Sequence, residues 1–367
     1  MNIALTSSAA LRNHKEATRI TLLSLAGELL KLGHQVVIIC QHAPGYPNYE
    51  CLNGVELYRY QYSLLPKLTG VALALRQIQK KKNIKFEIIH SFSSTPLFIL
   101  SNIAARLYAP KARIIHTLRS YSRVTGGNSF YFLLNLATKV TVPTKIFSYK
   151  LRSVPAKKIV VIPSSIELTK FYPQNKKELK KKYRYQNDTI IFHYGAMWQN
   201  KGTHLLLKSI PLLVLDNPKL KFLFAPRYND IKDLQEITKQ KNISQYVEFI
   251  TGEISIEEYV NLAEVVVLPY LNLKGTEGIP SCLLEAMACK TPVVTTRLPE
   301  IAEIADGAVY LADPGDAVSL VQQIKRALKE TSAAGSKAMI DKAYQIAAQH
   351  SLDKIAQRFL KLYKENC

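Results

Sequence analysis

The chain has 367 residues, of which 47% are hydrophobic and 21% are charged, and its formal net charge is +21. This length is sufficient for two domains with separate cores, and the composition is ordinary for a globular α/β protein. The sequence excludes a membrane-spanning helix, and its first residues predict a strand and not a signal peptide. Five scattered cysteines without metal-like spacing indicate free thiols in a reducing compartment: Cys40, Cys51, Cys282, Cys289 and Cys367.

The positive charge is concentrated in the first half of the chain. Residues 1–170 contain 23 Lys and Arg, 6 Glu and no Asp, a balance of +17, whereas the remaining residues contribute +4. A field of one sign favours an anionic partner, such as lipid headgroups, nucleic acid or an acidic glycan. A generally lysine-rich composition is the alternative explanation.

Strands and helices alternate along the first half. Periodicity predicts strands at 3–5, 35–40, 55–60, 86–90, 113–117, 139–143 and 158–162. It predicts helices at 16–32, 68–82, 96–108 and within 121–135. In the first of these helices we expect Ile20, Leu23 and Leu30 on the buried face and Gly33 as the stop. We expect Pro143 at the first position of a further helix.

The segment 58–82 has the composition of an interfacial membrane helix. Its first part carries aromatic, apolar and basic side chains, namely Tyr58, Tyr60, Tyr62, Leu64, Leu65 and Lys67. The helix that follows ends in the run Lys80–Lys82. Apolar groups of this kind enter the acyl boundary while cations meet anionic headgroups. The alternative is a helix that packs on the core and has a solvated end.

The same alternation resumes after a polar, lysine-rich connection at 163–188, which we expect to contain a solvated helix. Strands are predicted at 190–194, 220–225, 247–250, 265–269, 291–295 and 308–311. Helices are predicted at 202–215, 255–263, 298–305, 317–329 and 337–363. Two such halves favour two doubly wound α/β domains, in which ligands bind at the carboxyl ends of the strands.

The stretch 275–294, GTEGIPSCLLEAMACKTPVV, carries two glutamates between two predicted strands. Glu277 falls in the loop after the first strand, and Glu285 falls in the helix that follows. The amino terminus of that helix attracts anions, and carboxylates accept hydrogen bonds from sugar or ribose hydroxyls. Two glutamates on a solvated helix face are the alternative explanation.

This stretch resembles the E-x7-E signature of the retaining GT-B glycosyltransferases called family 4. The resemblance implies that Glu277 holds the transferred sugar and that Glu285 holds the ribose. It implies that backbone amides line the path of the diphosphate, from Gly278, Ile279, Ser281, Cys282, Leu283 and Leu284. Pro280 has no N–H and is excluded from this set.

A second segment, HYGAMWQNKGTHLLLKSI, is similar to the family loop that clamps the donor diphosphate with an arginine and a lysine. It places Gly195 in this donor-binding loop. Lys201 matches the lysine, whereas Ala196 occupies the place of the arginine. One charge-assisted contact of about 1.5–3 kcal/mol is therefore missing. We expect Arg227 or Lys274 to supply the second cation from a neighbouring loop.

In the first half, IIHTLRS resembles the strand-end motif whose histidine lies near the anomeric carbon. Aligning Thr117 with the family threonine puts Arg119 in the place of that histidine. Arginine cannot act as a general base, but it can bind an acceptor or a phosphate. The first loop, TSSAALRNH, lacks the paired glycines of the family. An inverting enzyme would need a positioned base, for which His14 is the one candidate in this loop.

The resemblance implies a GT-B fold: two Rossmann-like domains face a cleft, and a C-terminal helix crosses back to the first. The predicted domains are 1–170 for the acceptor, 171–350 for the donor and 351–367 for the helix. The implied reaction moves a sugar from a nucleoside diphosphate (UDP or GDP) sugar to an acceptor hydroxyl with retention, with Glu277 and Lys201 as catalytic residues. No cofactor or metal is predicted.

The basic first half favours a lipid-linked or anionic glycan acceptor, with the protein on the inner, cytoplasmic face of an anionic membrane. Three alternatives remain open. The substitutions at Ala196 and Arg119 fit a non-catalytic partner of an active transferase. A sugar-nucleotide epimerase would have the same fold. A nucleic-acid binder is suggested by charge alone, since no recognised motif accompanies it.

Overall fold

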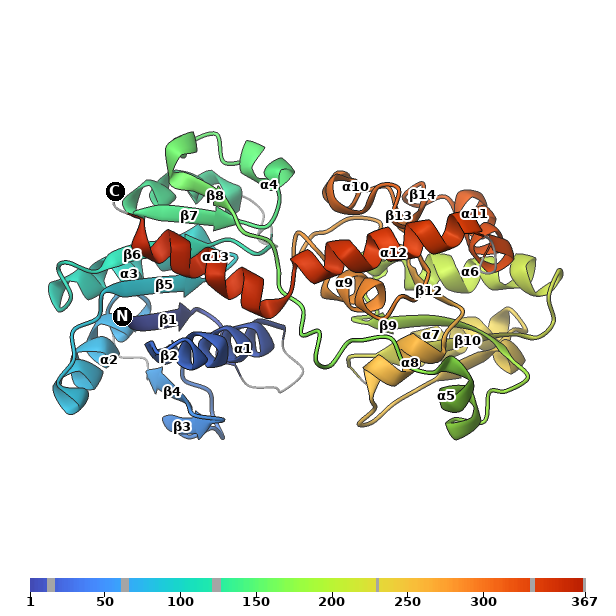
Figure 1. Cartoon of the computed structure of the whole chain (residues 1–367), viewed down its shortest axis with the longest axis horizontal. Coiled ribbons are helices and arrows are strands. Elements are labelled where there is room, and N and C mark those ends of the chain that lie inside the picture. The colour runs from blue at the N-terminus through green and yellow to red at the C-terminus, as the bar shows by residue number, and fades with distance from the viewer. Residues whose placement is uncertain (12–16, 61–65, 121–126, 229–230, 331–333, 366–367) are drawn as a thin grey trace. The chain divides into compact units, whose positions relative to one another are not determined.

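The computed structural model describes the whole chain except residues 12–16, 61–65, 121–126, 229–230, 331–333 and 366–367. The chain forms two compact α/β units (Figure 1). The first unit comprises Met1–Ser165 together with Leu352–Cys367, and the second comprises Ile166–Ser351. His14, Tyr62, Leu64 and Leu65, which the sequence singled out, lie outside the described residues.

The first unit contains an eight-stranded sheet in the order β3-β4-β2-β1-β5-β6-β7-β8. All neighbouring strands are parallel except β3 and β4, which form an antiparallel hairpin. The strands are β1 (Asn2–Ser7), β2 (Gln35–Gln41), β3 (Tyr49–Leu52), β4 (Val55–Tyr60), β5 (Ile88–Phe92), β6 (Arg113–Thr117), β7 (Lys139–Val142) and β8 (Ile159–Val161).

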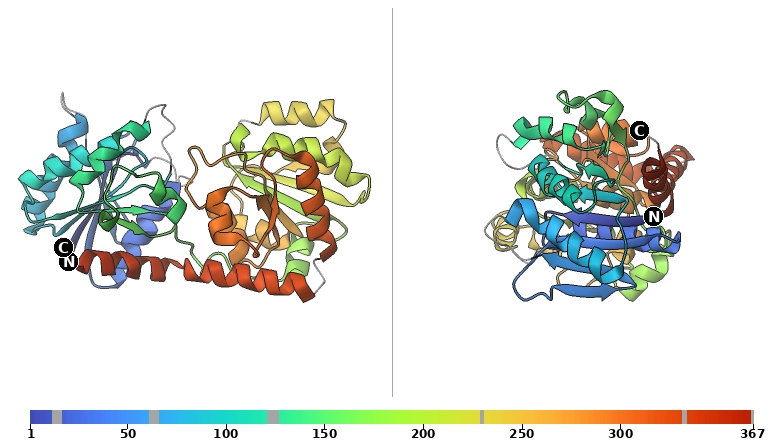
Figure 2. Two further views of the ribbon diagram at one scale, coloured as in Figure 1. Left: turned by 90° about the horizontal axis from the view of Figure 1, so that it is seen from above. Right: turned by 90° about the vertical axis from the view of Figure 1, so that its left-hand side faces the viewer.

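Helices cover both faces of this sheet (Figure 2), because alternate strand residues are apolar on both sides. Ile3 and Leu5 of β1 belong to one buried cluster, and Ala4 belongs to the other. The helical segments are α1 (Ala17–Lys31), α2 (Pro66–Lys82), η1 (Pro96–Phe98), α3 (Ile99–Ala104), η2 (Ala105–Leu107), η3 (Gly127–Leu136), α4 (Lys145–Tyr149), η4 (Ala156–Lys158) and α13 (Leu352–Lys364).

The structure corrects two predictions about helices in this unit. The buried face of α1 consists of Leu22, Leu25, Ala26 and Leu29, and the predicted Leu23 and Leu30 pack against the same cluster. The prediction was wrong for Ile20, which is 46% exposed. Helix α4 begins after an N-cap at Thr144, whose hydroxyl accepts a hydrogen bond from the Phe147 amide at 3.0 Å. Pro143 therefore precedes the cap and is not the first helical residue.

The final predicted helix, 337–363, is two helices that belong to different units. Helix α12 (Ala334–Gln349) ends before His350, and α13 begins at Leu352. The chain between them is extended enough for Ser351 to form a bridge with Ile166. Helix α13 is fixed to the first unit by the Tyr363 hydroxyl, 2.6 Å from His90 Nδ1, and by Arg113, which donates to the Tyr363 carbonyl at 2.8 Å.

The second unit contains a six-stranded parallel sheet in the order β11-β10-β9-β12-β13-β14. Its strands are β9 (Thr189–Gly195), β10 (Leu220–Pro226), β11 (Val247–Phe249), β12 (Val265–Leu268), β13 (Val293–Thr296) and β14 (Tyr310–Ala312). Its other helices are α5 (Lys176–Lys182), η5 (Gln199–Lys201), α6 (Thr203–Val214), α7 (Lys232–Gln240), η6 (Ser244–Tyr246), α8 (Ile256–Leu262), α9 (Ser281–Ala288), α10 (Pro299–Ala305) and α11 (Ala317–Glu330).

Both faces of this sheet are also buried. Phe192 and Leu268 pack in a cluster with residues of α8, α9 and α12, whereas Ile191 and Val267 pack on the other face with residues of α6 and α11. The predicted doubly wound architecture of two Rossmann-like units is therefore confirmed. Because β9 and β12 are neighbouring parallel strands, the loops that follow them lie next to each other.

Three fully buried histidines make the fold sensitive to acid. Burial lowers the pKa of His116 to about 4 and that of His193 to about 4, and it lowers the pKa of His90 well below its usual value of 6.5. The unfolded chain therefore binds more protons below pH 6.5, so stability is complete above that pH and is lost as the pH falls. Each histidine adds a slope approaching about 1.4 kcal/mol per pH unit.

We therefore expect the free energy of unfolding to fall steeply between pH 6.5 and pH 4.5. Guanidinium titrations at three or four pH values within and above this interval measure it. Gln replacing His193 should flatten the slope relative to the unchanged chain. An unfolding free energy that stays constant from pH 7.5 to pH 4.5 would contradict the buried, neutral state of these rings.

Candidate functional site

The candidate site lies at the carboxyl edge of the second sheet, where the loops after β9 and β12 are hydrogen-bonded to each other. The Asn200 carbonyl accepts a hydrogen bond from the Leu271 amide at 2.9 Å, and the Asn200 side chain donates to the Lys274 carbonyl at 3.0 Å. These bonds fix one loop against the other. The structure thus brings Lys201 of the first loop beside the loop that carries Glu277.

Gly202 makes this close approach possible. Its φ is +76°, and a Cβ built on it would lie 1.8 Å from the Pro269 carbonyl oxygen. Only glycine has both the left-handed conformation and the missing side chain that this crossing requires. Gly202 also precedes α6, so it sets the point at which that helix begins.

The Lys201 ammonium group is held in place by three neighbours from both loops. It donates to the Thr276 hydroxyl, and it lies 5.1 Å from the ring centre of Tyr270 and 5.9 Å from that of Trp198. Lys201 is only 8% exposed. A cation that is oriented and partly desolvated in this way is suited to bind a phosphate.

Glu277 lies one residue after Thr276 and is half-buried, and Gly278 and Ile279 after it are buried. Helix α9 then begins at Ser281, with Pro280 at the N-cap and no side chain capping its first amides. The Leu283 amide donates to the Pro280 carbonyl at 3.0 Å, so this predicted donor is engaged within the turn. The uncapped amides of the first turn can hydrogen bond an anion.

Glu285 lies on α9 beside a buried tyrosine. Burial raises the pKa of the Glu285 carboxyl, and the charge of Glu277 acts in the same direction, whereas the Tyr194 hydroxyl and the charges of Arg227 and Lys170 oppose the rise. The Tyr194 hydroxyl donates to the Cys282 carbonyl at 2.9 Å. Glu285 is half-buried, and it lies in the electrostatic field of both Glu277 and Arg227.

The two candidates for the second cation differ in their placement. Arg227 is half-buried, its amide donates to the Gly195 carbonyl at 2.8 Å, and its charge lowers the pKa of Cys282 against the larger effect of burial. Lys274 is exposed. Gly195 has φ +112°, and a Cβ there would lie 3.4 Å from the Cys282 sulfur. Arg227 is therefore positioned at the start of α9, and Lys274 lies at the periphery.

On the first unit, Arg119 follows β6 at the carboxyl edge of its sheet. It lines a small cavity of about 20 Å³ together with Thr117, Ser164 and Ser165. The Thr117 hydroxyl lies 2.6 Å from His90 Nε2. The other acceptor-side candidate, His14, lies outside the described residues.

Four residues that contact the predicted site residues were missed by sequence reasoning: Thr276, Tyr194, Trp198 and Tyr270. Thr276 and Tyr194 hold the predicted residues, and Trp198 stacks on Tyr228 with ring centres 6.1 Å apart. Thr276 directly precedes Glu277, so its position next to the motif was a usable signal. Tyr194 and Cys282 lie 88 positions apart, so only the fold reveals their contact.

Within the described part of the chain, no three His, Cys, Asp or Glu side chains are grouped to hold a metal.

Two family models match the chain, one on each half. Residues 19–170 match the model described as Glycosyltransferase Family 4, and residues 188–330 match the model described as Glycosyl transferases group 1. With two Rossmann-like units, these matches define the class: the chain is a glycosyltransferase of the GT-B fold. Within that class, its two halves match the models of the family 4 and group 1 type.

Similar curated proteins are transferases of several pathways. The GPI3 subunit of phosphatidylinositol N-acetylglucosaminyltransferase of Saccharomyces cerevisiae is 22% identical over 92% of this chain and 77% of its own. The N-acetyl-alpha-D-glucosaminyl L-malate synthase of Bacillus anthracis is 22% identical over 83% of each chain. A putative teichuronic acid biosynthesis glycosyltransferase of Bacillus subtilis is 25% identical over 82% of each chain.

Solved structures share the fold over the whole chain. A sucrose-phosphate synthase from Thermosynechococcus elongatus superposes with a TM-score of 0.82 at 18% identity, covering 99% of this chain and 98% of its own. Anabaena HepE in complex with UDP superposes with a TM-score of 0.80 at 14% identity, covering 99% of each chain. These likenesses establish the fold alone.

Proposed function

We propose that the protein transfers a sugar from a nucleoside diphosphate sugar to an acceptor hydroxyl with retention of anomeric configuration, as a family 4 enzyme. The observation that carries the proposal is the convergence of Lys201, the Glu277 loop and the uncapped first turn of α9 at one edge of the second sheet. A cation and free amides bind a diphosphate, and the carboxylates accept hydrogen bonds from hydroxyls. Anabaena HepE, which binds UDP, supports a nucleotide donor.

In this proposal each residue has a separate task. Lys201 and the amides of the first α9 turn neutralise the leaving diphosphate, whose negative charge grows as the glycosidic bond breaks. Glu277 orients the transferred sugar, and Glu285 holds the ribose. The leaving phosphate accepts the proton of the acceptor hydroxyl, so no protein base is required at that step.

Arg227 is the residue we propose as the second cation of the donor site. Arg227→Ala should weaken UDP binding about 10- to 100-fold, which corresponds to one charge-assisted contact of about 1.5–3 kcal/mol. The matched variant Lys274→Ala, which removes an exposed cation from the neighbouring loop, should leave UDP affinity unchanged. Isothermal titration calorimetry measures both. Equal affinities in both variants and the unchanged chain would reject the assignment.

The acceptor we propose is a lipid-linked or anionic glycan at the cytoplasmic face of an anionic membrane. Residues 88–166 contain eleven Lys and Arg and no Asp or Glu, and η3 exposes Phe130 by 42% and Phe132 by 54%. Apolar and basic groups together favour contact with anionic headgroups. The names of two relatives mention malate and teichuronic acid, which are acidic. No helix in the described ranges is long and apolar enough to span a bilayer.

A product analysis tests the proposed reaction against its alternatives. The purified chain is incubated with UDP- and GDP-sugars and an acceptor mixture, and the anomeric proton of any product is assigned by NMR. Transfer with retention supports the proposal, and transfer with inversion would overturn its stereochemistry. Donor binding without turnover would favour a non-catalytic partner, and conversion of one nucleotide sugar into another would reveal an epimerase.

A further inference from the structure

The first unit contains a pocket that the proposed reaction does not use. It lies between the β3–β4 hairpin and α2, elements that are labelled in Figure 1, and we call it the hairpin pocket. Its volume is about 470 Å³, within the range of sites for small ligands. One wall is a single face of α2, whose lining residues recur every three or four positions: Gly70, Leu73, Ala74, Gln77, Ile78 and Lys81.

The opposite wall is aromatic. The rings of Tyr49 and Tyr58 lie 5.0 Å apart at an interplanar angle of 53°, and Tyr60 lines the pocket beside them. A Cβ on Gly70 would lie 2.3 Å from the Tyr60 ring, so this glycine lets the ring pack directly on α2. The Asn48 and Gln77 side chains add amide groups to the lining.

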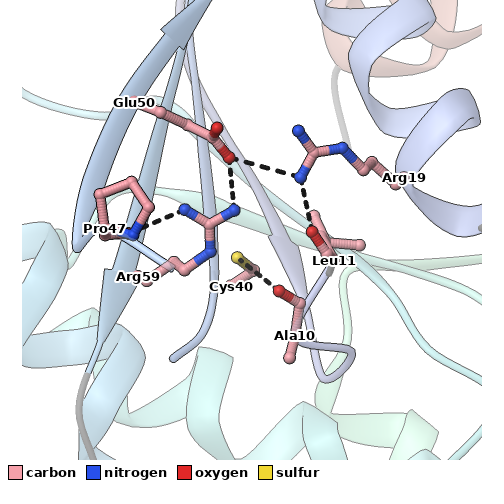
Figure 3. A network of polar contacts seen from close by, with 7 residues as sticks. All are labelled: Ala10, Leu11, Arg19, Cys40, Pro47, Glu50 and Arg59. Atoms are coloured by element: carbon pink, nitrogen blue, oxygen red, sulfur yellow. Dashed lines mark hydrogen bonds and ion pairs between the residues drawn. The ribbon is translucent and has the colours of Figure 1, made fainter. Parts of the chain in front are cut away.

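A buried cluster with excess positive charge, shown in Figure 3, adjoins the pocket, because its Arg59 also lines the pocket. Arg59 and Arg19 both contact Oε1 of Glu50, the latter at 3.3 Å. The two arginines also donate to the Pro47 carbonyl at 2.8 Å and the Leu11 carbonyl at 2.6 Å. Arg19 is 2% exposed and Arg59 is 4% exposed. Two guanidinium groups thus share one carboxylate, and a buried charge without a partner is costly.

Further charges at the pocket leave it positive. Lys82 pairs with Glu56 at 2.5 Å. Lys81, at the end of the α2 wall, is exposed and lies 5.3 Å from the ring centre of Tyr49, and it makes no ion pair with a described residue. The charged side chains that line the pocket, Arg59 and Lys81, are both cations. An anion is therefore favoured in the pocket.

We propose that the hairpin pocket binds an acidic sugar residue, such as a uronate, of the acceptor glycan. Aromatic rings pack against the apolar C–H face of a sugar, amides bond its hydroxyls, and an ammonium group binds its carboxylate. The pocket supplies all three in Tyr58, Gln77 and Lys81. A concave site of this composition fits a sugar ring better than the flat surface of a bilayer.

The position of the pocket suits an acceptor. Tyr60 is paired with Gln41 at the carboxyl end of parallel strands, so one end of the pocket lies at the edge of the sheet where ligands bind. Lys81 lies eleven positions along α2 from Gly70, or about 16 Å away. A glycan that reaches this edge can therefore extend along α2. This inference rests on the proposed function for the identity of the glycan as acceptor.

Binding of a defined acidic trisaccharide to the full chain tests the inference. Trigalacturonate should bind measurably by calorimetry, and maltotriose, its neutral counterpart, should bind at least about tenfold more weakly. Lys81→Gln should weaken trigalacturonate binding about tenfold, because it removes the ammonium group. Leu73→Trp should weaken it similarly by filling the pocket, with no change in charge. Lys85→Gln, an exposed lysine outside the pocket, should leave it unchanged.

Three outcomes would overturn the inference. Trigalacturonate could fail to bind at millimolar concentration, it could bind equally well to Lys81→Gln and Leu73→Trp, or maltotriose could bind as tightly. The unchanged chain could instead bind phosphatidylglycerol vesicles and not trigalacturonate, with vesicle binding abolished in Lys81→Gln and Leu73→Trp. That result would assign the pocket to membrane lipid. UDP affinity, measured on the same samples, should be equal in all variants. If the unchanged chain did not bind UDP, the proposed function would be refuted, whereas the binding of an acidic sugar in the hairpin pocket would not.

Discussion

Lys201→Ala should lower kcat/KM for sugar transfer about 100- to 1,000-fold, the effect expected when one preorganised group that stabilises developing charge is removed. The Lys201 ammonium group is already oriented by Thr276 and lies over the Tyr270 ring, so little reorganisation is needed when the diphosphate departs. The side chain is 8% exposed, and its charge is therefore weakly screened by solvent. UDP affinity should fall as well, by about 10- to 100-fold.

Two further variants separate charge from position. Thr276→Val keeps the ammonium group but removes the hydroxyl that orients it, so kcat/KM should fall less than in Lys201→Ala. Lys208→Ala removes an exposed lysine from α6, the helix that follows Lys201, and should leave kcat/KM unchanged. Initial rates with a radiolabelled donor give kcat/KM for Lys201→Ala, Thr276→Val and Lys208→Ala. A Lys201→Ala protein with normal kcat/KM would show that the diphosphate binds elsewhere.

The strands were predictable from sequence because both sheets are buried on both faces. Parallel strands such as β2 and β12 are nearly continuous apolar runs, and their bounds were predicted to within one residue. Strand β3 was not predicted, since its residues alternate between exposed and half-buried. The turn after it, Asn53–Gly54, has φ angles of +51° and +81° and was a usable hairpin signal.

The site was predictable only where residues are close in sequence. Glu277, Glu285 and the start of α9 lie within one motif, so spacing and resemblance were enough to single them out. The hydrogen bond from Asn200 to the Lys274 carbonyl joins positions 74 apart, and no local sequence pattern predicts it. The burial of Arg19 and Arg59 was not predicted, because arginine is seldom buried and no local pattern marks these two positions.

Gly202→Ala should have the largest effect on stability, because two separate costs act at one residue. A left-handed φ of +76° costs an alanine about 1–2 kcal/mol, and the added Cβ would lie 1.8 Å from the Pro269 oxygen. That oxygen belongs to the backbone, so the two loops must move apart. We expect a total loss of at least about 3 kcal/mol in the free energy of unfolding and a fall in UDP affinity, since Lys201 moves with the loop.

Gly315→Ala is the matched control for this substitution. Gly315 lies in the same unit with a φ of +82°, but a Cβ there would meet nothing within 4 Å. It should therefore lose only the conformational cost of about 1–2 kcal/mol and keep normal UDP affinity. Guanidinium denaturation and calorimetry measure both quantities, and the difference between the variants isolates the contact with Pro269. If the two variants lost equal stability and bound UDP equally, the close crossing of the loops would not be what holds Lys201 in place.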